Sequence, residues 1–172
     1  MVEALESTDP VPVCLTTLRG VIDLIVVGRA RGPLADAAAE YERRLARYCT
    51  LTVRELREEP VRPGDREAAM ERERRRVAPL VEGAWLVALD ASGTQLASEE
   101  LAGFVREREE TAPQRTAFVI GGPQGLAPEL VGGARTVLSL GRATLPHQLA
   151  RVVLGEALYR AFTILRNEPY HR

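Results

Sequence analysis

The sequence predicts an α/β fold in which a mainly parallel sheet is flanked by helices. Apolar runs of strand length alternate along the chain with longer stretches whose apolar residues recur at helical spacing. The length of 172 residues suits one domain, and 45% hydrophobic with 27% charged residues is ordinary globular composition. We therefore expect a single domain over residues 21–172, preceded by a loose extension over residues 1–20.

The first half of that domain is predicted to alternate strand and helix twice. A run that is apolar except for Asp23 and is closed by a glycine predicts a strand at Val21–Val27. Alternating apolar and charged residues predict a half-buried strand at Leu51–Leu56. Helical periodicity predicts helices at Pro33–Tyr48 and Arg66–Leu80, and the charged run Glu71–Arg76 favours a solvated helix face over an RNA-binding patch.

The second half continues the same alternation. Short apolar runs predict strands at Trp85–Leu89, Thr116–Ile120 and Arg135–Leu138, with the first ending in a turn at Asp90–Gly93. Ser98 followed by two glutamates is a good helix start, so a helix is expected from there to Glu110. A longer apolar periodicity predicts the last helix at Gln148–Leu165.

Composition excludes several classes of protein. The 23 basic residues are all arginines and face 24 acidic residues, so the chain is not an indiscriminate nucleic-acid coat, although a local basic face stays possible. Two cysteines cannot form a disulfide framework, and no Cys/His spacing suggests a metal site. No apolar run approaches a membrane span, and the N-terminus is not a secretory signal. These features predict a cytoplasmic protein without metal or membrane.

The first segment with chemical potential is FVIGGPQGL, residues 118–126. Ligands of open α/β sheets bind just past the carboxyl ends of strands, and glycines allow backbone to approach a ligand closely. The segment lacks the Lys-Ser/Thr of a P-loop and the spacing of a dinucleotide-binding loop. A ligand-binding loop and a plain tight turn both remain open for it.

Two further segments carry polar groups. Residues 138–147 join the last predicted strand to the last helix and include His147, which fits either a helix cap or a polar core position. The chain ends in Tyr170, His171 and Arg172, which together offer stacking, proton transfer and phosphate binding. A solvated tail fits that end equally well.

Four motifs in one order and spacing resemble a known family. They are IGGPQGL at 120–126, S-L-x-x-x-T-L-P-H-x-L-x-R-V at 139–152, EALYRA at 156–161 and N-x-P-Y-H-R at 167–172. Together they resemble the RlmH family, the ribosomal RNA large subunit methyltransferases H of the SPOUT superfamily. DLIVVG at 23–28 is similar to that family's first strand. The resemblance covers about residues 21–172, and residues 1–20 have no counterpart in it.

The resemblance implies a parallel sheet with a C-terminal trefoil knot, a homodimer, and S-adenosyl-L-methionine as methyl donor without a metal. Carried over by position, the cofactor-binding residues are Leu89, Gly121, Gly122, Leu140, Gly141, Arg142, Ala143, Thr144 and Leu145. The tail residues Tyr170, His171 and Arg172, with Arg160, would form the reaction site across the dimer interface. Variation is expected at Gly141–Ala143, so an argument there rests on backbone rather than side chains.

The implied activity is methylation of N3 of a pseudouridine in large-subunit (23S) ribosomal RNA, with assembled ribosomes as substrate. N3 carries a proton, and His171 has a suitable intrinsic pKa to accept it, while Arg160 and Arg172 suit phosphates or a developing oxyanion. A catalytically silent RNA-binding protein on the same scaffold is the alternative. A hydrolase using the glycine turn is disfavoured, since no nucleophile–base pair accompanies it.

Overall fold

The computed structural model describes residues 20–60, 63–111 and 115–171, which contain a parallel sheet of five strands. The strands are β1 (Val21–Val27), β2 (Thr50–Leu56), β3 (Trp85–Gln95), β4 (Thr116–Ile120) and β5 (Thr136–Ser139). Their order across the sheet is β2-β1-β4-β3-β5, and every pairing is parallel. The predicted α/β class is confirmed.

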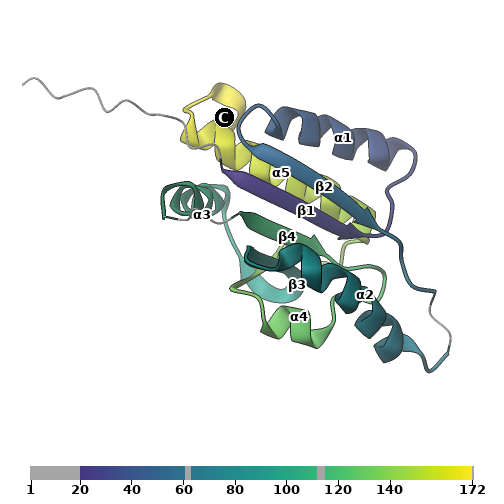
Figure 1. The fold of residues 1–172 in the computed structure, drawn as a ribbon. Helices are drawn as coiled ribbons and strands as arrows, with labels where there is room; N and C mark the ends of the chain where they lie inside the picture. Colours follow the sequence, from purple (N-terminus) through teal and green to yellow (C-terminus); the bar gives the residue numbers. More distant parts are fainter. Residues whose placement is uncertain (1–19, 61–62, 112–114, 172) are drawn as a thin grey trace, which may run out of the picture.

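Helices cover both faces of the sheet (Figure 1). The first face carries α1 (Pro33–Leu45), α3 (Ser98–Thr111) and α5 (His147–Leu165), and the second carries α2 (Arg66–Val81) and α4 (Pro128–Gly132). A short 3₁₀ helix, η1 (Pro169–His171), follows α5. Among the described residues, no helix is both long and apolar enough to cross a membrane.

The apolar run of β1 explains its central place. Leu24 and Val26 pack toward α1, α3 and α5, whereas Ile25 and Val27 pack toward α2 and α4. All four are at most 1% exposed. A strand covered on both faces needs apolar residues on both faces rather than on one, and the one charged residue of β1, the buried Asp23, pairs with Arg115. Burial of each such apolar side chain stabilises the fold by roughly 1.5–3 kcal/mol.

Two elements differ from the sequence prediction. The expected end of the third strand at Leu89 is wrong, because β3 continues to Gln95 after a bulge: Leu89 and Thr94 both pair with Leu138. Gly93 allows β3 to pair with β5 again after the bulge, since a Cβ at this position would lie 2.7 Å from the backbone of β5. Helix α4 was not predicted at all. The trefoil knot implied by the family resemblance stays a prediction.

The two ends of the sheet are built differently. The parallel strands end at one edge, where the connecting loops after β1, β3, β4 and β5 gather and where α5 begins. Figure 1 shows the arrowheads of β1 and β2 pointing away from the C-terminus, which lies at the opposite end. Helix α5 therefore runs antiparallel to the strands and joins the carboxyl edge of the sheet to the chain end.

The single tryptophan lies at the amino edge of the sheet. Trp85 opens β3, and its indole Nε1 donates a hydrogen bond to Thr136 Oγ1 at 3.1 Å. The Arg108 and Arg135 guanidinium carbons lie 3.5 and 5.0 Å from the centre of the indole ring system. Cations over an aromatic face are attracted by its quadrupole, so these contacts hold α3 and the start of β5 against β3.

Candidate active site

A cavity of about 630 Å³ opens at the carboxyl edge of the sheet. Its walls come from three segments. They are Leu89, Asp90 and Ala91 in the middle of β3, the loop after β4 that includes Gly121, Gly122, Pro123 and Gly125 (the glycine loop), and the loop between β5 and α5. Ile120, Leu138 and Ala150 also line it. The size is that of a small-molecule pocket, and the place is where ligands of parallel α/β sheets bind.

The residues expected to bind the cofactor converge on this cavity. Leu89, Gly121, Gly122, Leu140, Gly141, Ala143, Thr144 and Leu145 all line it. Arg142 belongs to the same loop but is exposed and is not among the lining residues. The backbone of the loop therefore faces the cavity, while the arginine side chain lies at the surface.

The glycine loop is a tight turn held by one hydrogen bond within the turn and one from α2. Gly125 N donates to Gly122 O at 2.9 Å, and the Arg66 guanidinium donates to Gln124 O at 3.2 Å. A Cβ at Gly121 would lie 2.5–2.8 Å from the backbone of Gly125 and Leu126, so the turn cannot close around a larger residue. A glycine at this position is required by the loop's own geometry.

Gly122 faces a different neighbour. A Cβ there would meet Val27 Cγ1 at 3.1 Å and both carboxylate oxygens of Glu73 at 3.4 and 3.5 Å. Glu73 on α2 is buried beneath the loop and accepts a hydrogen bond from Glu59 N at 2.9 Å. Burial raises the pKa of Glu73 above the usual glutamate value, against the lowering effects of that amide and of Arg76.

Few ionisable groups reach the cavity. Among the described residues that line it, Asp90 and His147 are the only ones with ionisable side chains. Asp90 Oδ1 is engaged, since it accepts hydrogen bonds from Ser92 N at 2.9 Å and Ser92 Oγ at 2.6 Å. The described residues contain no group of three His, Cys, Asp or Glu side chains that could hold a metal ion. The other lining residues are mostly apolar or glycine, with the hydroxyls of Ser139 and Thr144 among them, and this lining suits an uncharged ring system.

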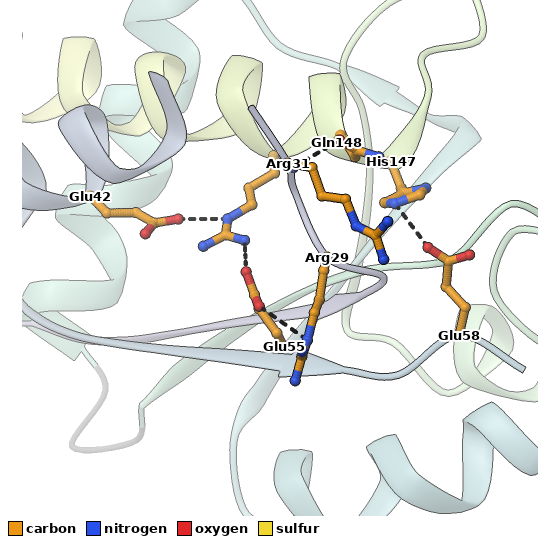
Figure 2. A network of polar contacts seen from close by, with 8 residues as sticks. Arg29, Arg31, Glu42, Glu55, Glu58, His147 and Gln148 are labelled. Atoms are coloured by element: carbon orange, nitrogen blue, oxygen red, sulfur yellow. Dashed lines mark hydrogen bonds and ion pairs between the residues drawn. The ribbon is translucent and has the colours of Figure 1, made fainter. Parts of the chain in front are cut away.

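His147 lines the cavity and points toward Glu58 (Figure 2). It is the first residue of α5, and its side chain is 11% exposed. Its Nε2 lies 3.2 Å from Glu58 Oε1, just after β2. The ring rests on Gly28, where a Cβ would be 2.4 Å from Nε2 and where φ is +108°. Sequence reasoning singled out His147 but missed Gly28 and Glu58, which lie far from it in the chain.

A second polar cluster fixes the start of α5 (Figure 2). Arg151, buried on α5, pairs with Glu42 of α1 at 2.7 Å and with Glu55 of β2. Burial alone would lower the pKa of Arg151. The hydrogen bonds to the two carboxylates raise it by more than burial lowers it, so the net shift is upward and the side chain stays charged. Gln148 Oε1 also accepts a hydrogen bond from the Arg31 backbone N–H, with 3.2 Å between nitrogen and oxygen. These contacts hold α5 and the β1–α1 loop beside the cavity.

The tail is packed at the other end of α5. The Tyr170 ring contacts Tyr159 edge-on at 4.7 Å between centroids, and its hydroxyl lies 3.2 Å from Glu156 Oε1. Arg160 pairs with Glu156 and lies over the Tyr170 ring at 5.0 Å. His171 is described only through its place in η1, and Arg172 lies outside the described residues. The solvated-tail reading is wrong for Tyr170.

One chain therefore does not bring all predicted site residues together. Arg160 lies about 20 Å from His147 along the axis of α5, at 1.5 Å per residue. The expected cofactor residues and the expected reaction-site residues occupy opposite ends of that helix.

Comparison with a family model gives a match over nearly the whole described chain. The matching model is described as "Predicted SPOUT methyltransferase" and covers residues 21–171. That range includes the cavity, α5 and the tail as far as His171.

Curated proteins match at high identity. "Ribosomal RNA large subunit methyltransferase H" of Gemmatimonas aurantiaca is 46% identical over 153 residues, which is 88% of this chain and 99% of that protein. The protein of the same name from Syntrophotalea carbinolica is 43% identical, over 87% of this chain and 97% of that one.

Solved structures share the fold at low identity. A probable methylase family protein from Haemophilus influenzae aligns with a TM-score of 0.55 at 16% identity, covering 90% of this chain and 71% of that one. A probable methyltransferase from Bordetella pertussis gives 0.50 at 13% identity, covering 84% and 97%. At such identity the likeness concerns the fold alone.

Proposed function

Because this chain belongs to the SPOUT methyltransferase family, and within it to the ribosomal RNA large subunit methyltransferases H, we propose that it transfers a methyl group from S-adenosyl-L-methionine to large-subunit ribosomal RNA. The finer proposal is that the target is N3 of a pseudouridine in 23S RNA and that the substrate is the assembled ribosome. We propose that the protein acts in the cytoplasm.

The observation that carries the proposal is the cavity at the ends of β3, β4 and β5. Its volume of about 630 Å³ fits a nucleoside-sized ligand, and the turn at Gly121 leaves no space for a side chain. Leu89, Leu140 and Leu145 offer apolar walls for an adenine ring, while loop backbone around Gly141–Thr144 offers hydrogen-bonding groups. These residues fit an adenosyl group, and they would hold it.

The bound donor supplies an activated methyl on a sulfonium. The protein's own share is to place the acceptor nitrogen in line with that methyl and to remove the N3 proton. Exclusion of water from an apolar cavity strengthens both effects. No metal has a role in this proposal.

We infer that the working unit is a homodimer in which the tail of one copy completes the cavity of the other. Support comes from the separation of the two sets of residues along α5. In this arrangement Tyr170, His171 and Arg172, with Arg160, form the nucleotide side of the site. Arg160 keeps its charge because the hydrogen bond and charge of Glu156 raise its pKa, although burial opposes this.

The experiment has two arms. Isothermal titration calorimetry of the purified protein with S-adenosyl-L-methionine tests the cavity, and a tritium-transfer assay on ribosomes that lack the modification tests the reaction. Transfer to 23S RNA, located by mass spectrometry at N3 of a pseudouridine, is the expected result. Binding of RNA without binding of the cofactor would instead support the silent RNA-binding protein.

A further inference from the structure

We propose that His147, held by Glu58, accepts the N3 proton during methyl transfer. This inference rests on the proposed function and goes beyond it, because the family resemblance directs attention to the tail histidine instead. The proposal assigns a catalytic residue to the same copy of the chain that holds the cofactor.

The cavity wall offers few side chains that could accept a proton. Asp90 and His147 are its only titratable lining residues among those described. Asp90 is a weak base that already accepts two hydrogen bonds from Ser92. An imidazole is the side chain whose basicity suits proton removal near neutral pH. His147 is therefore the group in the cavity wall that is suited to the task.

Two neighbours hold the His147 imidazole in place, Gly28 beneath the ring and Glu58 beside Nε2. Gly28 leaves room for the ring that any Cβ would occupy, and it does so in a left-handed conformation with φ of +108°. Glu58 Oε1 lies 3.2 Å from Nε2. The Nε2 atom is buried, with no geometrically ideal hydrogen bond in the described structure. A small shift of the Glu58 carboxylate completes one.

That contact determines which nitrogen is the base. A carboxylate next to Nε2 favours the tautomer with the proton on Nε2, which leaves the lone pair on Nδ1. The same carboxylate then stabilises the imidazolium that forms when Nδ1 takes a proton. This is the arrangement by which a carboxylate orients a general base in other enzymes.

The surrounding charges do not replace Glu58. Glu55 and Glu42 are engaged by the buried Arg151 on α5, and Arg29 of the β1–α1 loop lies 3.8 Å from Glu55. Figure 2 shows the Arg31 side chain on the same side of α5 as His147. The acidic group in contact with the imidazole is thus Glu58, while the nearby arginines draw on other carboxylates or lie at the surface.

The tail offers no better base among its described side chains. Burial, the hydrogen bond with Tyr41 and the negative charge of Glu156, which accepts a hydrogen bond from the phenol, raise the pKa of Tyr170, so it stays protonated near neutral pH. Arg160 is a permanent cation paired with Glu156. These groups suit the binding of a nucleotide and the stabilisation of an anion, and we assign them that role.

Proton removal and methyl transfer involve one bond broken at N3, one bond formed there and one bond broken at sulfur. His147 Nδ1 takes the proton from N3 of the uracil-type ring, and the electron pair left on N3 forms the new bond to the methyl carbon. The carbon–sulfur bond of the sulfonium donor breaks, and its electron pair stays on sulfur as a neutral thioether. His147 is left as an imidazolium beside Glu58 and returns its proton to water after product release.

The kinetic test uses the full-length dimer on ribosomes under single-turnover conditions. His147→Gln should lower the transfer rate by about 10²–10⁴-fold and leave the cofactor Kd within about threefold. Wild-type rates should rise with pH through the neutral range to a plateau, and the variant should lose that rise. Glu58→Ala should slow transfer by at least about tenfold. Arg29→Gln, in the neighbouring cluster, is the matched control and should stay within threefold.

A second readout needs no activity. The chain has only two histidines, so ¹⁵N-labelled wild-type protein and the variants His147→Gln and His171→Gln assign both rings by NMR. Long-range ¹H–¹⁵N spectra should show the neutral His147 ring protonated on Nε2. Glu58→Ala should convert it to a mixture of tautomers.

The outcomes separate this inference from the proposed function. An active wild type with an equally active His147→Gln variant, or a wild-type His147 ring protonated on Nδ1, overturns the inference and leaves the function intact. A folded His147→Gln protein that loses cofactor binding makes His147 a binding residue and also overturns it. Wild-type protein that transfers no methyl to RNA contradicts both.

Discussion

Gly122 lines the cavity, but a side chain at this position would act on the site from the far side of the loop. Its missing Cβ would point at Val27 and at the buried Glu73, away from the open cavity. A side chain at this position would therefore displace the loop that lines the cavity rather than fill the cavity directly. The sequence motif identified the glycine correctly as part of the loop, but the direction of its Cα–Cβ bond follows only from the packing of α2.

Gly122→Val is expected to weaken binding of S-adenosyl-L-methionine by at least about tenfold. The reason is that a Cβ at 3.1–3.5 Å from its neighbours, with two further methyl groups, forces the loop to shift. Calorimetry measures the effect. Gly132→Val on α4, where a Cβ meets nothing within 4 Å, is the control and should bind normally. Tight binding by folded Gly122→Val protein would show that the pocket lies elsewhere.

Glu73 carries a pH-dependent cost. Its pKa is raised in the folded protein, so its ionised form weakens folding at neutral pH. Glu73→Gln keeps an oxygen for Glu59 N and removes the charge, so we expect the variant to have a higher free energy of unfolding than wild type at pH 7. The gain should shrink as pH falls through the folded-state pKa, because the wild-type carboxyl then binds a proton.

Thermal unfolding at several pH values checks this expectation. Glu67→Gln, an exposed glutamate in the first turn of the same helix, should change the midpoint little at any pH. A Glu73→Gln protein that is less stable than wild type at pH 7 would mean that the carboxylate charge is satisfied by Arg76.

At the scale of elements, the strands and long helices were predictable because each carries a periodic pattern over many residues. The exceptions are short or depend on partners. Helix α4 spans five residues and has no period to detect, and the extension of β3 through Gly93 depends on pairing with β5. The start of α5 at His147 was predicted within one residue. Its contact with Glu58 could not be predicted, because nothing local in the sequence joins them.

Helix η1 gives the tail a fixed place, and the expected effect of its loss is specific. Deletion of residues 170–172 removes the Tyr170–Tyr159 contact, worth about 0.5–1.5 kcal/mol, so the unfolding midpoint should fall by only a few degrees. Cofactor affinity should be nearly unchanged, since the residues expected to bind the cofactor line the cavity without any contribution from the tail. Methyl transfer should stop. Full activity on ribosomes after the deletion would refute the assigned role of the tail.

At the scale of the whole molecule, the cofactor half and the tail half of the proposed site lie on opposite ends of one helix. We expect light scattering to give about twice the chain mass of 18.9 kDa. Mixing offers a sharper test: His147→Gln homodimers and tail-deleted homodimers should each be inactive, whereas mixed dimers should regain up to about half of the wild-type activity per dimer. An active monomer, or no recovery on subunit exchange, would contradict the shared site.

The position of Trp85 has a practical consequence for spectroscopy. Because it is the chain's one tryptophan and is contacted by two arginines at the amino edge of β3, its fluorescence reports on packing at that edge. Leu89, at the cavity, lies about 13 Å farther along the strand. Emission should therefore shift when the sheet unfolds and stay nearly constant during ligand titration. Optical detection of cofactor binding calls for a dye introduced near the cavity, such as on a cysteine replacing the exposed Arg142.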